Sequence, residues 1–131
     1  MSALILDANA YSDFLRGNPI MARAVRDAQE VHLPLIVLGE LLAGFAAGTR
    51  TQSNRETLAR FMVQPRVHLM NPDEKTAQQY ADLYKWLRDH GRPIPTNDLW
   101  IAALVRQHRM PLLTFDKHFA GIPGVDLMDA T

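Results

Sequence analysis

Four acidic residues stand directly beside hydrophobic runs, where a carboxylate is costly unless it is paired, protonated or bound to a cation. They are Asp7, Glu40, Asp98 and Asp116. Glu40 is the most conspicuous, because no other Asp, Glu, Lys or Arg occurs between residues 30 and 50. Four carboxylates brought together would form an oxygen-rich site for a divalent metal ion. We therefore expect a metal site if the fold unites them.

The available donor types favour Mg²⁺ or Mn²⁺ over zinc. The chain has no cysteine, and its histidines show no pair at ligand spacing, so hard oxygen ligands predominate. A bound ion of this kind can lower the pKa of water and neutralise charge that builds on a phosphodiester. The pattern therefore indicates hydrolysis of a phosphodiester rather than serine- or histidine-based chemistry.

Each acid taken alone also fits a purely structural role. Asp7 could cap a following helix, and Asp98 could be an acid in the first turn of a helix, where the dipole favours a negative charge. Asp116 could be an ordinary turn residue, and Glu40 could pair with a buried arginine. One shared site accounts for all four placements together.

The overall composition indicates one globular domain, residues 1–131, that is neither disordered nor strongly charged. Hydrophobic residues make up 47% of the chain, and 14 Lys and Arg balance 14 Asp and Glu. The absence of cysteine excludes disulfides and is compatible with a cytoplasmic protein. Residues 31–48 form the most apolar segment, but they include Pro34, Glu40 and three glycines. We expect a core helix there and no membrane segment.

Short apolar runs alternate with helical patterns along the chain. The runs predict strands at 3–6, 32–35, 66–70 and 112–115. The helical patterns predict helices at 11–16, 20–30, 36–47, 51–63, 73–90 and 96–108. This alternation indicates an α/β fold with a mostly parallel sheet. Because functional sites gather at the carboxyl ends of such strands, we expect Asp7, Asp98 and Asp116 on one rim.

Two helix starts carry specific capping predictions. For the helix at 73–90 we expect Asn71 as the N-cap, Pro72 in the first turn and Glu74 completing a capping box. For the helix at 96–108 we expect Thr96 as the N-cap. Gly91 is expected to end the first of these helices.

Four segments together resemble the PIN-domain ribonucleases, and most closely the VapC-type toxins of bacterial toxin–antitoxin pairs. They are Leu4–Ser12, Pro34–Gly44, Pro95–Ala103 and Leu112–Phe119, in this order and over essentially the whole chain. The resemblance implies a PIN-like, three-layer α/β/α domain with a short, mostly parallel sheet.

The resemblance also implies a Mg²⁺- or Mn²⁺-dependent endoribonuclease. It places Asp7, Glu40, Asp98 and Asp116 on the four acidic positions of the family, with Asn9 and Thr114 as supporting residues. We expect the three aspartates to hold the metal directly or through water, and Glu40 to orient or deprotonate the attacking water.

Two positions depart from the family pattern. Ala8 stands where a hydroxyl residue is frequent, and His118 stands where many members carry a further acid. We interpret the five histidines as surface or helix-end residues. His118 is the one exception that could take part in the site, because it lies two residues after Asp116, although we favour a structural role for it. The departures leave open the outer part of the site and the number of metal ions.

The partners implied by the resemblance are an RNA substrate, a cognate antitoxin protein and a second copy of the chain in a homodimer. An antitoxin arginine placed among the carboxylates would compete with the metal.

Two other functions remain open from the residues themselves. One is a non-catalytic PIN-like scaffold that binds RNA or protein. The other is a phospho-accepting receiver domain, although the chain lacks the central strand-end aspartate that such a domain needs.

Overall fold

The computed structural model describes residues 2–128. Four strands are present in this range: β1 (Ala3–Leu6), β2 (Glu30–Pro34), β3 (Val67–Met70) and β4 (Leu112–Leu113). The α-helices are α1 (Ala8–Leu15), α2 (Pro19–Asp27), α3 (Leu35–Ala47), α4 (Thr51–Met62), α5 (Glu74–Asp89) and α6 (Thr96–His108). A 3₁₀ helix, η1 (Lys117–Phe119), follows β4.

The strands form one parallel sheet in the order β3-β2-β1-β4. The segments that follow β1 and β4 are therefore neighbours, although more than 100 residues separate them in sequence. Since all strands run the same way, their carboxyl ends share one edge of the sheet. The predicted α/β fold with a parallel sheet is confirmed.

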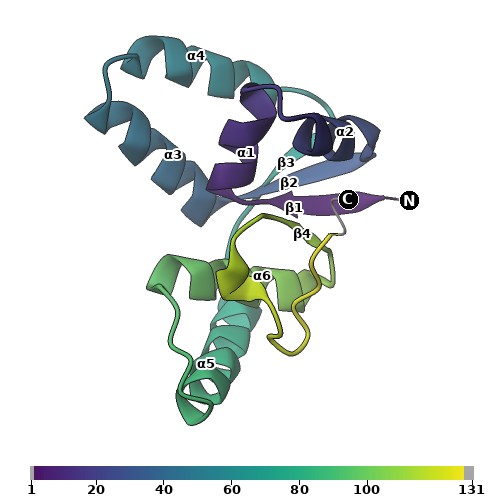
Figure 1. Cartoon of the computed structure of the whole chain (residues 1–131), viewed down its shortest axis with the longest axis vertical. Helices are drawn as coiled ribbons and strands as arrows, with labels where there is room; N and C mark the ends of the chain where they lie inside the picture. The colour runs from purple at the N-terminus through teal and green to yellow at the C-terminus, as the bar shows by residue number, and fades with distance from the viewer. Residues whose placement is uncertain (1, 129–131) are drawn as a thin grey trace.

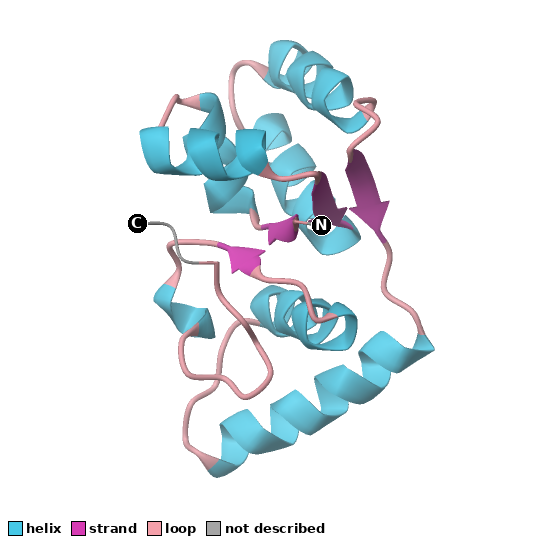
Figure 2. Cartoon of the chain, turned by 90° about the vertical axis from the view of Figure 1, so that its right-hand side faces the viewer, coloured by secondary structure: helices cyan, strands magenta, loops and turns pink. Residues whose placement is uncertain are grey.

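Helices cover both faces of this sheet. Figures 1 and 2 show α1 to α4 on one side of the strands and α5 with α6 on the other. Helices α5 and α6 pack against each other, and α3 packs against α4. The three-layer arrangement expected from the resemblance is thus present, and it leaves the carboxyl ends of the central strands bordered by helices from both layers.

The sheet and α6 form the centre of the hydrophobic core. Leu4, Ile5 and Leu6 of β1 are fully inaccessible to solvent. Helix α6 is buried continuously from Ile101 to Val105. Burial of this much apolar surface stabilises the fold and holds both elements rigidly. The acids next to these buried runs are therefore attached to the least mobile part of the molecule.

Two helix boundaries on the α1–α2 side differ from the prediction. Helix α1 begins at Ala8 instead of residue 11, because the Asp7 carboxylate caps the backbone N–H of Ala10. Helix α2 ends at Asp27 instead of residue 30, because Glu30 pairs with Ala3 in the sheet. Strand β2 accordingly begins two residues earlier than the predicted start at residue 32.

The predicted caps of α5 and α6 were wrong in detail. The N-cap of α5 is Asp73, not Asn71, and its capping box is completed by Thr76 instead of Glu74. Pro95 occupies the N-cap position of α6, so Thr96 is the first helical residue. The ends of α5 and β3 are otherwise close to expectation, and Gly91 adopts a positive φ just beyond α5.

Strand β4 is shorter than predicted, because the chain turns immediately after Leu113. The Thr114 hydroxyl accepts a hydrogen bond from the backbone N–H of Asp116, and the Asp116 side chain caps η1. This turn replaces the expected continuation of the strand to residue 115. Within residues 2–128, no helix is long and apolar enough to cross a membrane.

We predict that α6 depends on the packing of its buried face. Replacing Val105, which is 1% exposed, by alanine should lower the free energy of unfolding by about 2 kcal/mol, because two methyl groups are lost and a cavity remains. The same change at Val63, which is 79% exposed, should alter it by less than about 0.5 kcal/mol. Urea denaturation of the two variants measures the difference, and equal losses would contradict this packing.

Candidate metal centre

Asp7 is the most buried of the four acids, with 5% of its surface exposed. One carboxylate oxygen, Oδ1, accepts a hydrogen bond from the Ala10 N–H at 2.8 Å, so the residue also caps α1. The structural role considered for Asp7 is therefore real, but it uses only one of the two oxygens. Desolvation by burial raises the pKa of Asp7, and the charges of Asp116 and Asp98 raise it further.

The second oxygen of Asp7 is held by Thr114. The Thr114 hydroxyl donates to Asp7 Oδ2 and accepts the backbone N–H of Asp116 at 2.9 Å. Thr114 is 8% exposed, so this connection is shielded from water. Hydrogen bonds of this kind fix the orientation of a carboxylate before any ligand arrives. Thr114 thus fixes the positions of Asp7 and Asp116 relative to each other.

Asp98 and Asp116 approach each other across the gap between α6 and η1. His118 lies between them: its Nδ1 is 2.9 Å from Asp98 Oδ2 and 3.3 Å from Asp116 Oδ1. The hydrogen bond to Asp98, together with the charge of Asp116, raises the pKa of His118. One potential ligand atom from each of these three residues lies within 4.8 Å of the others.

Glu40 joins the cluster from α3. Desolvation raises the pKa of Glu40, and the nearby charges of Asp98 and Asp7 raise it further, while a hydrogen bond from the Asn97 side chain opposes the shift. Glu40 therefore lies near enough to Asp98 and Asp7 for their charges to act on it. The structure therefore brings all four predicted acids to the carboxyl edge of the sheet.

The cluster carries more negative charge than its surroundings compensate. Among residues 2–128, the only side chain that forms a salt bridge with any of the four acids is His118. In particular, Glu40 has no arginine partner within this range, which contradicts the buried ion pair considered for it. Closely spaced carboxylates without lysine or arginine partners are the donor set that suits a hard divalent cation.

The two predicted supporting residues differ in their placement. Thr114 lies at the centre of the hydrogen-bond connection described above. Asn9 lies exposed in the first turn of α1, next to Asp7 in sequence, and makes no side-chain hydrogen bond within the described residues. Its supporting role stays a prediction.

Sequence reasoning missed two side chains of the centre. A structural role was favoured for His118, although its separation of two residues from Asp116 had marked it as the one histidine that could join the site. Asn97 was passed over, although it immediately precedes Asp98. Both depend on the packing of η1, α3 and α6 around one point, which residue spacing alone does not define.

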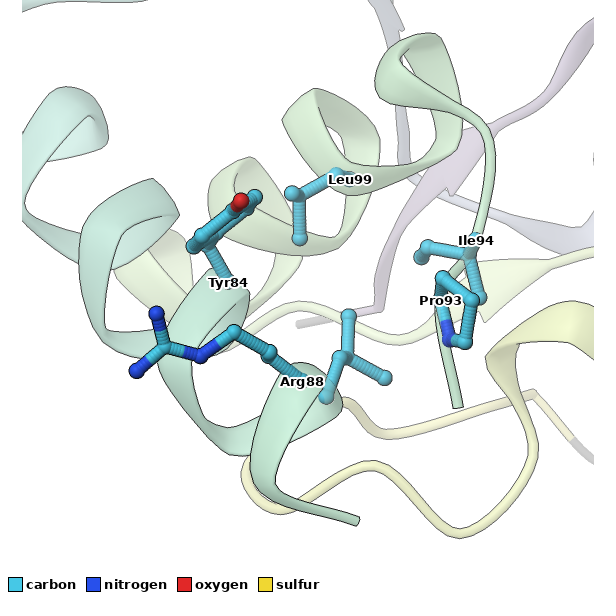
Figure 3. A pocket seen from close by; sticks show the side chains of 6 residues that line it. Tyr84, Arg88, Pro93, Ile94 and Leu99 are labelled. Carbon is cyan, nitrogen blue, oxygen red and sulfur yellow. The ribbon is translucent and has the colours of Figure 1, made fainter. Parts of the chain in front are cut away.

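A separate apolar pocket lies between the end of α5 and the start of α6. Its volume is about 190 Å³, and its lining consists of Tyr84, Leu87, Arg88, Pro93, Ile94 and Leu99. Figure 3 shows the Arg88 guanidinium directed away from Pro93 and Ile94. None of the four acids lines this pocket, so it is distinct from the carboxylate cluster.

Comparisons with known proteins agree on one protein family. The family model for the PIN domain matches residues 4–125. Ribonuclease VapC5 of Mycobacterium tuberculosis is 28% identical over 94% of this chain and 90% of its own length. Toxin FitB of Neisseria gonorrhoeae is 30% identical over 86% and 87%, respectively. The solved structure of VapBC-1 from nontypeable Haemophilus influenzae superposes with a TM-score of 0.86 at 25% identity, covering 98% of both chains.

The raised pKa of Glu40 yields a prediction about stability. An acid whose folded-state pKa is raised destabilises the fold at pH values above that pKa, and the penalty disappears as the pH falls towards its ordinary pKa near 4.5. In EDTA at pH 7, Glu40→Gln should therefore raise the free energy of unfolding by up to about 1 kcal/mol, since the group is partly screened by solvent. The gain should shrink as the pH falls and vanish below pH 4.5.

Denaturation curves of the wild type and Glu40→Gln across this pH range provide the measurement. Asp82→Asn, a change of an exposed acid on α5, serves as the matched control and should show no comparable pH-dependent gain. A Glu40→Gln variant that is less stable than the wild type at pH 7 would contradict this prediction. It would mean that a favourable interaction of the Glu40 carboxylate outweighs the cost of its burial and of the neighbouring charges.

Thr114 provides a second prediction. Thr114→Val removes the hydroxyl that holds Asp7 and Asp116 but keeps the side-chain volume, so affinity for Mn²⁺ should fall by about 10- to 100-fold. Thr114→Ser keeps the hydroxyl and should retain most of the affinity. Isothermal titration calorimetry measures both values, and equal binding by the two variants would exclude this role for Thr114.

Proposed function

Because this chain belongs to the PIN-domain family, we propose that it is a metal-dependent endoribonuclease and the toxin of a toxin–antitoxin pair. The observation that carries the proposal is the convergence of Asp7, Glu40, Asp98 and Asp116 without a lysine or arginine partner in the described residues. The similarity of the chain to ribonuclease VapC5 and to toxin FitB, over most of their lengths, supports both the proposed activity and the proposed toxin role.

The residues at the centre fit a divalent metal ion, and we propose Mg²⁺ or Mn²⁺. Asp7, Asp98 and Asp116 would hold it, since each offers a carboxylate oxygen at the same edge of the sheet. When bound, such an ion activates water and stabilises the negative charge that develops on the scissile phosphate. The Asp7–Thr114 hydrogen bond keeps the Asp7 carboxylate oriented for this task.

Glu40 is suited to accept the proton of the attacking water. Burial and the charges of Asp98 and Asp7 raise the pKa of its carboxyl, which makes the carboxylate a stronger base near neutral pH. In this assignment, a Glu40 carboxylate oxygen takes the proton while the water oxygen bonds to phosphorus. The bond from phosphorus to the leaving sugar oxygen breaks, and that oxygen takes a proton from solvent.

The partners follow from the same relationship. VapBC-1 and its relatives are complexes of a toxin with an antitoxin, and we propose a cognate antitoxin for this chain. An antitoxin arginine inserted among the carboxylates would neutralise them and exclude metal. We further propose a single domain over residues 1–131, a homodimer and a cytoplasmic location, where RNA is available as substrate.

RNA cleavage tests the proposed activity. Purified protein freed of antitoxin should cut total RNA into discrete fragments with Mg²⁺ or Mn²⁺, and not with EDTA. Asp98→Asn should reduce the rate by at least about 100-fold, because the change removes a charged ligand. Asp82→Asn, a change of an exposed acid on α5, should retain the wild-type rate.

The outcome that would overturn the proposal is cleavage that continues unchanged in EDTA or in Asp98→Asn. Circular dichroism of each variant ensures that loss of activity does not reflect loss of the fold.

A further inference from the structure

The segment that carries His118 is fixed from several directions. The Phe119 side chain is 1% exposed and anchors η1 in the core. Arg92 donates to the backbone carbonyls of His118 at 3.2 Å and Ala120 at 2.5 Å, and the His118 N–H donates to Asp116 Oδ1 at 2.9 Å. The imidazole is therefore presented to the acidic cluster by a backbone that is held on both sides.

The position of the imidazole nitrogen matches that of a metal ligand. Adjacent ligands around an octahedral ion with bonds of about 2.1 Å lie roughly 3 Å apart. His118 Nδ1 is 2.9 Å from an Asp98 oxygen and 3.3 Å from an Asp116 oxygen, so the spacing of these atoms is of this size.

We propose that His118 releases its Nδ1 proton to solvent and binds the metal directly through this nitrogen, and that the nitrogen makes the site prefer a divalent transition-metal ion over Mg²⁺. The inference rests on the proposed function and specifies its metal. Mg²⁺ binds almost entirely through oxygen, whereas imidazole nitrogen suits transition-metal ions. An imidazole nitrogen ligand therefore favours Mn²⁺ over Mg²⁺, whereas a carboxylate at the same position would bind both ions.

His118 could alternatively act only as a hydrogen-bond donor that orients Asp98. Both arrangements place Nδ1 near Asp98, but only direct ligation places nitrogen on the ion. Mn²⁺ is a suitable probe, since its unpaired electrons couple to a bonded ¹⁴N nucleus. Electron spin echo envelope modulation of Mn²⁺-loaded protein reports this coupling without reference to RNA cleavage.

The wild type should show ¹⁴N coupling of a directly bound imidazole, and His118→Gln and His118→Asp should both lose it. His68→Gln is the matched control and should keep the coupling, because His68 lies on β3 at the opposite edge of the sheet. In competition titrations, His118→Asp should reduce the preference for Mn²⁺ over Mg²⁺ by at least about tenfold.

Bound Mn²⁺ without ¹⁴N coupling in the wild type would overturn the inference and leave the proposed nuclease intact. Coupling that persists in His118→Gln would equally overturn it, since another histidine would then be the ligand. Failure of the wild type to bind Mn²⁺ or Mg²⁺ at all would count against the proposed function as well.

Discussion

The crowding of four carboxylates at one partly buried edge of the sheet is the constraint on which this structure depends. The pKa values of Asp7 and Glu40 are raised by burial and by the neighbouring acids, so the folded chain holds these groups in an unfavourable arrangement. Acids with perturbed pKa values concentrate at functional sites. A bound cation would reverse the sign of the interaction, because the same burial that penalises bare charges strengthens their attraction to a metal.

The rest of the fold supplies the rigidity that such an arrangement requires. Asp7 follows the fully buried strand β1, and Asp98 precedes the continuous buried face of α6. Asp116 is fixed by the turn at Thr114 and by η1, whose Phe119 lies in the core. Each of these three aspartates is thus attached to a different buried element. Repulsion cannot separate them without disturbing the packing of the sheet.

Much of this could be predicted from the sequence, because the signals were local or relied on a simple topological rule. The apolar run before Asp7 and the isolated charge of Glu40 indicated the acids, and parallel strands implied a common edge for Asp7 and Asp116. The role of His118 could not be predicted in this way. Its contact with Asp98 spans 20 residues and depends on how η1 packs against α6. The N-cap of α5 was predicted wrongly for a similar reason. Asn71 and Asp73 can both cap a helix, and the sequence alone did not decide between them.

The most direct test of the account is anomalous diffraction from crystals of the protein soaked in Mn²⁺. The account predicts an anomalous peak at the carboxyl edge of the sheet, within bonding distance of Asp98 and Asp116 and adjacent to Asp7. At a saturating Mn²⁺ concentration, a peak elsewhere with none among these carboxylates would contradict it, because the cluster would then have to be stable without a cation.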